Sequence, residues 1–307
     1  MKSEEWRSAD GAGWPAPQSS SFILHSSFAE PAESRLGVIG FPIGHTLSPD
    51  ILSAALAAIG LPASYGAYEV TPEELPRFLE QLRRPEWRGV NVTVPHKQAV
   101  LAAMDELSVE ARAIGAVNTI RGVDGRLAGF NTDSPAFRAE VEAAFGSLAG
   151  KRVAILGAGG AARAVCHALK DGPSALWIWN RHPERAQELS RHFPHVALLD
   201  DLRRLRDVDL LVNCTSAGLR PGESPIPDEC VPADVSMYDL IYNPPTTRLM
   251  QLVEARGGRA VNGLGMLVRQ AALALEIWTE RTPPLDVMFE AARRGLAQRQ
   301  DGMQREE

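Results

Sequence analysis

Three segments between residues 91 and 133 carry side chains that could do chemistry together. The run Asn91-Val-Thr-Val-Pro-His-Lys97 is typical of a strand that ends in Thr93 and Lys97, Asn118 begins a predicted hairpin, and Asp133 follows its end. Such hydroxyl, ammonium, amide and carboxylate groups suit a small polyhydroxy acid, because ligands of open α/β sheets bind outside the carboxyl ends of the strands. An ammonium beside a carboxylate can also stabilise the alkoxide of a reacting ketone and supply its proton. Taken singly, Lys97 could instead be a solvated charge and Asp133 a helix cap.

A glycine-rich turn predicts a dinucleotide site further along the chain. An apolar strand over 153–156 precedes Gly157, Gly159 and Ala162, which have the G-x-G-x-x-A spacing, and a helix begins near Ala161. Glycine permits the tight turn and the close approach of backbone N–H groups to a pyrophosphate, at which the helix directs the positive end of its dipole. A second apolar strand, 175–179, completes the context that a chance glycine triplet lacks.

The tip of that second strand indicates which dinucleotide is bound. Enzymes that use NAD carry an acidic residue there to accept from the ribose 2′-hydroxyl, whereas this chain has Asn180 and Arg181. A guanidinium pairs instead with a 2′-phosphate, and Arg185 could reach the same group. The sequence therefore predicts NADP.

Composition excludes several other classes of protein. The chain has 307 residues, enough for two domains. Its net charge of −6 gives no general attraction to nucleic acid or anionic membranes, and no apolar run is long enough to span a bilayer. The three cysteines are widely spaced and form neither a metal pattern nor a disulfide framework, which is typical of the cytoplasm. We therefore expect a small-molecule substrate and no nucleic-acid or membrane partner.

The elements that must position these residues alternate between strand and helix from residue 36 onward. This alternation predicts an α/β fold with mostly parallel sheets, and the glycine turn makes its second part a Rossmann-type unit. We predict Ser48 as the N-cap of a helix, one helix with an apolar face over 101–114, and a hairpin turn at Asp124-Gly125. The terminal helices are expected to return to the first domain.

Four regions follow from this pattern. Residues 1–34, rich in Ser, Ala, Pro and Gly, are predicted to be a disordered extension. Residues 35–133 are predicted to bind substrate and carry the catalytic groups, 134–262 to form the NADP-binding domain, and 263–307 to form the C-terminal helices.

The motifs together resemble the shikimate dehydrogenase family, from about residue 36 to 297. The segments that carry the resemblance are 40–49 (GFPIGHTLSP), 91–97 (NVTVPHK), 115–119 (GAVNT), 131–133 (NTD), the glycine turn, Asn180-Arg181, 213–218 (NCTSAG), 238–242 (YDLIY) and 262–270 (NGLGMLVRQ). The resemblance implies reversible, NADP-dependent reduction of 3-dehydroshikimate to shikimate in aromatic amino-acid biosynthesis.

The resemblance also implies roles for individual residues. Lys97 and Asp133 would be the catalytic pair, and no metal is implied. Substrate contacts would be Thr46, Ser48, Thr93, Asn118, Asp133, Tyr242 and Gln270. Cofactor contacts would be Gly157, Ala158, Gly159, Gly160, Ala161, Asn180, Arg181, Arg185, Leu240 and Gly263. Two positions depart from the family pattern, because Thr46 stands for the usual Ser and His182 for the frequent Thr.

Alternatives remain open at this stage. A quinate or dual quinate/shikimate dehydrogenase would share the fold and the catalytic pair, and Thr46 is the hint toward it. A non-catalytic NADPH-binding protein would be expected to have lost Lys97 or Asp133, yet both are present. The proton could come from Lys97 itself or be relayed through Asp133 or water, and the chain could be a monomer or a homodimer.

Overall fold

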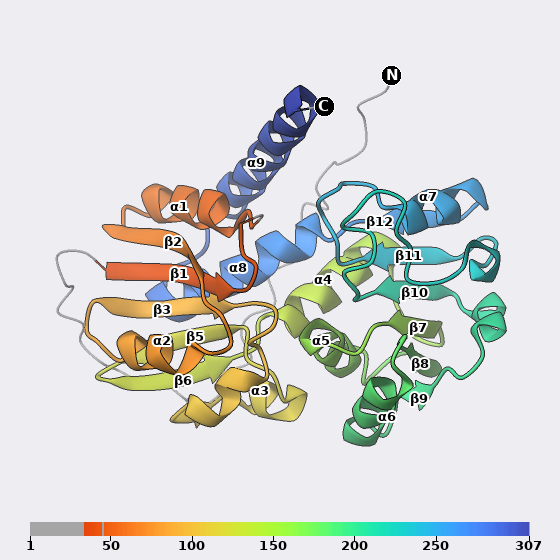
Figure 1. Ribbon diagram of the computed structural model, residues 1–307, viewed down its shortest axis with the longest axis horizontal. Helices are drawn as coiled ribbons and strands as arrows, with labels where there is room; N and C mark the ends of the chain where they lie inside the picture. The colour runs from red at the N-terminus through yellow and green to blue at the C-terminus, as the bar shows by residue number, and fades with distance from the viewer. Residues whose placement is uncertain (1–33, 45, 307) are drawn as a thin grey trace.

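A computed structural model describes residues 34–44 and 46–306, which form two halves, each built on a six-stranded sheet (Figure 1). The first sheet has the order β2-β1-β3-β5-β6-β4. Its strands are β1 (Ser34–Gly40), β2 (Ala63–Glu69), β3 (Trp87–Val92), β4 (Glu106–Leu107), β5 (Thr119–Val123) and β6 (Arg126–Phe130). Strands β1, β2 and β3 are parallel, whereas β5 is antiparallel to both of its neighbours.

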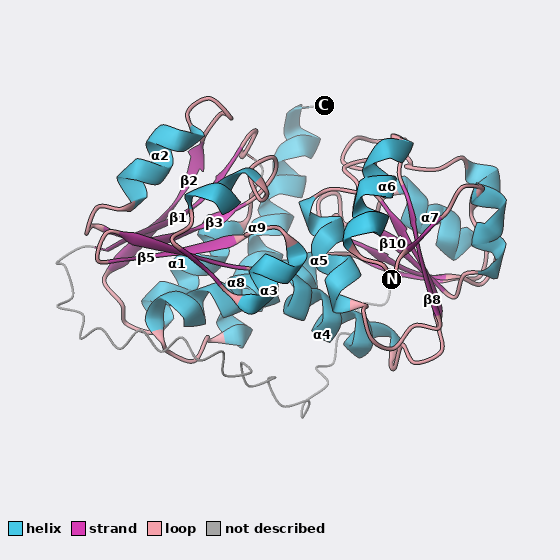
Figure 2. Ribbon diagram, turned by 90° about the horizontal axis from the view of Figure 1, so that it is seen from below, coloured by secondary structure: helices cyan, strands magenta, loops and turns pink. Residues whose placement is uncertain are grey.

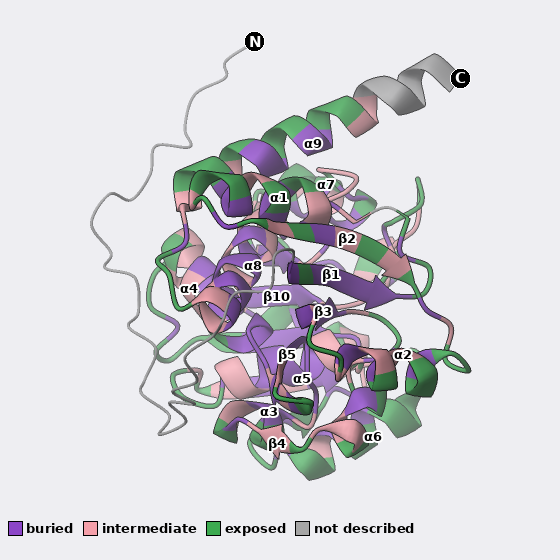
Figure 3. Ribbon diagram, turned by 90° about the vertical axis from the view of Figure 1, so that its left-hand side faces the viewer, coloured by how far each residue is buried: buried purple, intermediate pink, exposed green. Residues whose placement is uncertain are grey.

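Helices cover both faces of this sheet (Figure 2). They are α1 (Ser48–Ala58), α2 (Leu75–Leu82) and α3 (Val109–Ile114), with a 3₁₀ turn at Ala99–Ala103. One apolar core joins α1 to two helices from the end of the chain, α8 (Leu264–Thr279) and α9 (Leu285–Glu306), while a second core lies under α2. Strands β1 and β3, between these cores, are almost entirely buried (Figure 3).

The second sheet is entirely parallel, with the order β12-β11-β10-β7-β8-β9 of a doubly wound nucleotide-binding fold. Its strands are β7 (Arg152–Leu156), β8 (Ala175–Trp179), β9 (Ala197–Leu198), β10 (Leu210–Asn213), β11 (Ser236–Asp239) and β12 (Arg259–Val261). Its helices are α4 (Asp133–Phe145), α5 (Gly160–Ala168), α6 (Pro183–His192) and α7 (Arg248–Ala255), with 3₁₀ turns at Leu202–Asp207 and Asp228–Cys230. The predicted α/β fold class is confirmed.

Long-range contacts overturn one predicted helix. Residues 101–114 form the end of the 3₁₀ turn, the short strand β4 and then α3. The side chain of Asp105 accepts from Leu127 N at 2.7 Å and from Arg83 at 2.6 Å, which holds this segment to the edge of the sheet. Ser108 then starts α3 as its N-cap, accepting from Ala111 N at 3.0 Å. An apolar periodicity cannot report such breaks, because they depend on residues distant in the sequence.

Two smaller expectations at the start of the fold also need correction. Leu47 is the N-cap of α1, Ser48 is its first residue, and no side chain caps the helix. The predicted extension, residues 1–34, lies outside the described residues except for Ser34, which pairs with Ala63 because β1 begins there. The predicted domain boundaries stay predictions.

Helices α4 and α8 connect the halves. α4 follows β6 of the first sheet and packs on the second sheet, and α8 follows β12 of the second sheet and packs on the first. Trp278 near the end of α8 is 1% exposed, and its Nε1 donates to Ile120 O of β5 at 2.9 Å. None of the helices in residues 34–44 and 46–306 is long and apolar enough to cross a membrane.

Candidate active site

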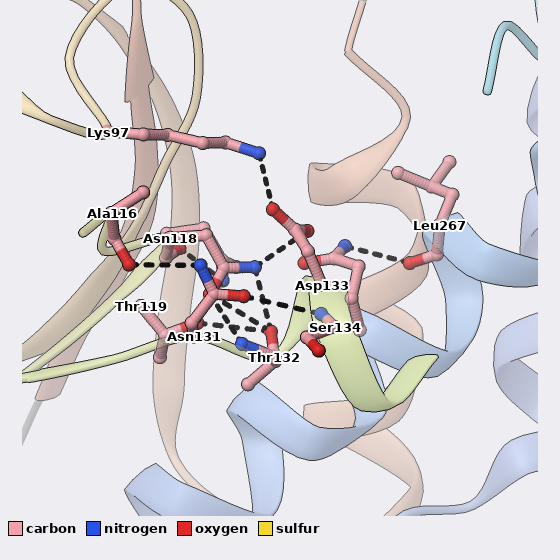
Figure 4. Close-up of polar contacts among 11 residues, drawn as sticks. Lys97, Ala116, Asn118, Thr119, Asn131, Thr132, Asp133, Ser134 and Leu267 are labelled. Atoms are coloured by element: carbon pink, nitrogen blue, oxygen red, sulfur yellow. Dashed lines mark hydrogen bonds and ion pairs between the residues drawn. The ribbon is translucent and has the colours of Figure 1, made fainter. Parts of the chain in front are cut away.

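Lys97 and Asp133 form a close pair at the carboxyl end of the first sheet (Figure 4). Lys97 Nζ donates to Asp133 Oδ2 at 2.6 Å, and their side chains are only 14% and 6% exposed. Lys97 follows β3 after a cis Val94–Pro95 bond, and its carbonyl accepts from Val117 N at 2.7 Å. Because Lys97 is paired and nearly buried, it is not the solvated charge that its sequence position alone allowed.

Asn118 fixes the other side of the Asp133 carboxylate. Its Nδ2 donates to Asp133 Oδ1 at 2.8 Å and to Thr132 Oγ1 at 2.9 Å, and its Oδ1 accepts from Thr132 N at 2.7 Å. The N-cap of α4 is Thr132, and Asp133 is the first helical residue. The carboxylate therefore serves Lys97 and Asn118 rather than capping its own helix.

The polar network extends to Tyr65 and Asn91, which the sequence reasoning did not assign. Tyr65 Oη donates to Asn91 Oδ1 at 2.8 Å, and Asn91 Nδ2 donates to Thr119 Oγ1 at 3.1 Å. Burial raises the pKa of Tyr65, a shift that its hydrogen bond with Ser48 opposes. The signal was present in the sequence, because Asn91 is an amide between Val90 and Val92, in a strand that the structure buries along its whole length. Such a group needs partners.

Thr46, Ser48 and Tyr242 form a second polar cluster beside the first. Thr46 Oγ1 donates to Ser48 Oγ at 3.1 Å and accepts from Ser48 N at 3.2 Å. The Tyr242 hydroxyl bonds to the backbone of Leu47, between these two residues, and burial raises the pKa of Tyr242. The structure thus gathers two hydroxyl side chains and a phenol at the start of α1.

The remaining predicted substrate residues, Thr93 and Gln270, lie on other elements. Thr93 follows β3, where its backbone N donates to Ile39 O at 2.9 Å, and Gln270 Nε2 donates to Leu267 O within α8 at 2.8 Å. In the part of the chain that the structure describes, neither side chain hydrogen-bonds to Lys97 or Asp133. His96, beside Lys97, is buried with its Nε2 2.7 Å from Val70 O, which is a structural role, and His45 lies outside the described residues.

The glycine turn lies between β7 and α5 and directly against the lysine. Gly157 has φ +107°, and a Cβ there would stand 3.1 Å from Cys214 O, so only glycine fits without strain. A Cβ on Gly159, the N-cap of α5, would point into open space. A Cβ on Gly160 would lie 3.1 Å from Lys97 Cβ, which places the first turn of α5 beside the Lys97–Asp133 pair.

The rest of the predicted cofactor set mostly follows other strands of the same sheet: Asn180 and Arg181 come after β8, Leu240 after β11 and Gly263 after β12. Arg181 and Arg185 are exposed, and neither forms an ion pair within residues 34–44 and 46–300. Asn180 Nδ2 donates to His182 O at 2.9 Å, and a Cβ on Gly263 would stand 2.2 Å from Leu240 O. Ala158 lies between Gly157 and Gly159, and Ala161 follows Gly160. A turn that only glycine fits, open space before a helix N-terminus and two exposed guanidinium groups without an ion-pair partner among the described residues fit a dinucleotide that carries a 2′-phosphate.

This arrangement defines a class of protein: a two-sheet α/β oxidoreductase in which a dinucleotide turn meets a Lys–Asp pair. Three family models match the chain: the shikimate dehydrogenase substrate binding domain over residues 38–120, shikimate/quinate 5-dehydrogenase over 139–220, and the shikimate 5′-dehydrogenase C-terminal domain over 263–293. The chain belongs to the shikimate dehydrogenase family, which confirms the resemblance inferred from its motifs.

Individual relatives are similar over most of the chain. The shikimate dehydrogenase (NADP(+)) of Thermus thermophilus is 44% identical over 263 residues, which cover 85% of this chain and 98% of that protein. A solved structure of shikimate 5-dehydrogenase from Thermus thermophilus, in complex with NADP(H) and shikimate, has a TM-score of 0.79 and covers 86% of this chain and 100% of that one, at 44% identity. The structure of shikimate dehydrogenase from Aquifex aeolicus has a TM-score of 0.81 at 33% identity and covers 87% and 100% of the two chains.

Proposed function

We propose that this chain is an NADP-dependent enzyme that reversibly reduces 3-dehydroshikimate to shikimate. One observation carries the proposal: the Lys97–Asp133 pair on the first sheet lies against the first turn of α5, where Gly160 leaves room for the lysine stem. The reacting carbon of a substrate on the first sheet would therefore face a dinucleotide on the second. The relatives named shikimate dehydrogenase (NADP(+)) support this substrate and cofactor.

Lys97 performs the acid–base part of the reaction. When bound, the nicotinamide cofactor supplies the hydride for ketone reduction. The Lys97 ammonium uses one proton on Asp133 Oδ2 and has others to direct at the carbonyl oxygen, where negative charge develops. Asp133, held from its other side by Asn118, keeps the ammonium oriented. A proton passes to the substrate oxygen in reduction and returns in alcohol oxidation, either from Lys97 directly or by relay through Asp133.

The substrate carboxylate belongs at the start of α1. The hydroxyls of Thr46 and Ser48 can donate there, the nearby Tyr242 hydroxyl adds a third donor, and the helix dipole favours an anion. Thr93, Asn118 and Gln270 would then contact the ring hydroxyls. The spacing between the two polar clusters sets which hydroxyl or ketone reaches Lys97.

A quinate or dual-specificity enzyme is the second candidate. Thr46, at a position where the family usually has Ser, adds a methyl group to the cluster of Thr46, Ser48 and Tyr242, and this difference favours the second candidate. The matched model that covers residues 139–220 describes both shikimate and quinate 5-dehydrogenases.

A substrate-by-cofactor matrix tests both candidates. Oxidation rates of shikimate and quinate are measured, each with NADP⁺ and with NAD⁺, on the same preparation. We expect shikimate with NADP⁺ to have the highest kcat/KM of the four combinations. A kcat/KM for quinate equal to or above that for shikimate would replace the proposal by the second candidate, and preference for NAD⁺ would remove the cofactor assignment.

The setting of the enzyme is part of the same proposal. Cys166, Cys214 and Cys230 are free thiols in the structure, which supports a cytoplasmic location. A monomer or a homodimer is expected in solution, and light scattering of the purified protein distinguishes the two.

A further inference from the structure

A buried carboxylate lies at the end of β11, outside the catalytic pair. Asp239 has no exposed surface, and its Oδ1 accepts from Asn213 Nδ2 and from Ile241 N, each at 3.0 Å. Its Oδ2 accepts from Thr247 Oγ1 at 2.7 Å. Burying a charge costs free energy even when it is hydrogen-bonded. A neutral residue would therefore fill a purely structural role at a lower free energy of desolvation.

Asn213, the first of these donors, connects Asp239 to the glycine turn through a chain of contacts. Asn213 ends β10, and its Oδ1 accepts from Thr215 N at 3.0 Å and from Thr215 Oγ1 at 2.7 Å. Thr215 Cγ2 in turn would lie 3.0 Å from a Cβ on Gly157, the residue of the cofactor turn with φ +107°. Asp239 thus holds, through Asn213, the 214–218 loop that packs on the pyrophosphate-binding turn.

The other two donors bracket the segment that carries Tyr242. The backbone N of Ile241 donates to Asp239 Oδ1. The preceding residue, Leu240, packs against Gly263. Thr247 is the N-cap of α7 and accepts from Met250 N at 3.3 Å while it donates to Asp239 Oδ2. Asp239 therefore fixes both ends of residues 240–247, and Tyr242 lies between them.

We propose that Asp239 is a positioning residue for both ligands, since its single carboxylate aligns the cofactor-side loop 214–218 with the segment that presents Tyr242 to the substrate. This inference rests on the proposed function, which assigns the two ligands. It predicts that a change at Asp239 weakens NADP and shikimate binding together, although Asp239 touches neither.

The ionisation of Asp239 makes this role visible in a pH profile. Burial raises the pKa of Asp239 to about 6, against the hydrogen bonds from Thr247, Ile241 N and Asn213. The titratable groups that face it, Cys214 and Tyr238, have pKa values raised by burial and stay neutral in this range. Above about pH 6 the ionised carboxylate accepts all three hydrogen bonds. When Asp239 is protonated, one of its oxygens carries a hydrogen that faces a donor, and that hydrogen bond is weakened.

The test compares Asp239→Asn with Asp209→Asn. Asp209 is an aspartate next to the same sheet but at the opposite, amino end, where it accepts from Arg152 N at 2.7 Å, so it controls for loss of a structural carboxylate. We expect Asp239→Asn to raise the KM for shikimate and the Kd for NADPH about three- to tenfold each, the scale of one lost hydrogen bond. kcat should stay within about twofold, and Asp209→Asn should leave KM and Kd unchanged.

The pH readout separates positioning from a loss of fold. The wild-type Kd for shikimate, measured by calorimetry, should rise as pH falls from 7.5 to 5, with its midpoint near 6. In Asp239→Asn the Kd should be raised and flat over the same range. Thr247→Val should weaken both ligands and Thr247→Ser should restore them, which keeps the test decisive if Asp239→Asn folds poorly.

Two outcomes would overturn the inference. One is a lower Tm for Asp239→Asn with unchanged KM and Kd, and the other is equal ligand binding by Thr247→Val and Thr247→Ser. Failure of the proposed function would give another result, because the wild-type enzyme would then not oxidise shikimate with either cofactor. The Kd for NADPH of Asp239→Asn would still test the role of Asp239.

Discussion

The side chains of Lys97 and Asp133 are each fixed in position by their contacts. The lysine stem packs against Gly160, its ammonium meets Asp133 Oδ2, and Asn118 occupies Oδ1. Arg181 and Arg185 differ from this pair, since both side chains are exposed to solvent. We expect them to bind the 2′-phosphate of the cofactor. Residues of the first kind should affect turnover, and residues of the second kind should affect cofactor affinity.

Replacing Lys97 by Ala should lower kcat by about 10²–10⁴-fold, the usual contribution of acid–base catalysis, with a much smaller change in the KM for shikimate. The reason is that Lys97 is the ammonium group paired with Asp133 in the site. Steady-state kinetics at the pH of full wild-type activity measure this, with the exposed Lys170→Ala as control. A variant that kept more than about half of its turnover would show that another group moves the proton.

Replacing Arg181 by Ala should weaken NADP⁺ binding by about 1.5–3 kcal/mol, the scale of charge-assisted hydrogen bonds, and leave NAD⁺ use nearly unchanged. The selectivity arises because only NADP⁺ carries the 2′-phosphate. Titrations with both cofactors measure it, and Arg191→Ala, an exposed arginine in the last turn of α6, is the matched control. Equal losses for the two cofactors would indicate damage to the fold instead.

Replacing Ser48 by Ala should raise the KM for shikimate several-fold and lower the Tm only slightly. Stability is spared because Ser48 does not cap α1, whereas its hydroxyl bonds to Thr46 at the proposed site for the substrate carboxylate. Thr46→Ser, which keeps the hydroxyl, should retain shikimate turnover. A Tm that fell while KM held would assign Ser48 to the fold alone, and better shikimate use with poorer quinate use in Thr46→Ser would favour the dual-specificity candidate.

At the scale of elements, the first sheet depends on a helix from the far end of the chain. β3 accommodates α8 at Gly89, where a Cβ would stand 2.3 Å from Trp278 Nε1 and 2.2 Å from Ile120 O. The indole then donates to the same carbonyl. Strand β3 leads to Lys97 and β5 starts beside Asn118, so α8 supports the strands that carry the site.

Trp278→Phe should therefore reduce the free energy of unfolding by about 0.5–1.5 kcal/mol more than Trp87→Phe. The first change removes the indole N–H that donates to the Ile120 carbonyl, and one such hydrogen bond contributes about that much. The indole of Trp87, on the opposite face of the same sheet, makes no hydrogen bond within the described residues, and it packs on Tyr68 and Phe78. Denaturant unfolding of both variants gives the comparison, and equal losses would mean that the hydrogen bond adds nothing.

At the scale of the whole molecule, the two halves meet along α4 and α8 at one place and near α3 at another. Glu140 of α4 pairs with Arg269 of α8, and Gly265 lets the carboxylate approach. At the other contact, Arg163 is paired with Glu188 of its own half, and its guanidinium lies against Gly115 of the first half. His192 Nε2 lies 2.9 Å from Ala113 O. Asp133 begins α4, and Gln270 follows Arg269 in α8. The contact between these helices therefore fixes the position of Asp133 relative to Gln270.

A double-mutant cycle on Glu140→Gln and Arg269→Gln should give a coupling free energy of about 1 kcal/mol in unfolding, since the pair is partly exposed and its charges are screened. Arg138 and Glu142, a surface pair within α4 alone, should give about 0.3–0.5 kcal/mol. The Glu140 and Arg269 variants should also lower kcat/KM for shikimate, which the control pair should not. Strict additivity of the first pair would show that it does not join the halves energetically.

The sequence by itself determined those features of this protein that depend on neighbours along the chain. Glycine spacing, strand–helix alternation and the arginines after β8 are local patterns, so the α/β class, the dinucleotide turn and the preference for a 2′-phosphate follow from them. The residues of the Lys97–Asp133 pair, for which we propose the catalytic role, were also singled out by residue types at strand ends and by the family motifs. Helix and strand positions were close wherever the pattern was periodic.

Only the tertiary structure decided the features that depend on residues far apart in the sequence. Asp105 breaks the predicted 101–114 helix through Leu127, and Tyr65 and Asn91 join the site from two different strands. The closeness of Gly160 to Lys97 and the three partners of Asp239 likewise arise from segments that meet only after folding. Burial and hydrogen-bond geometry are properties of such meetings, and no local pattern of residue types encodes them.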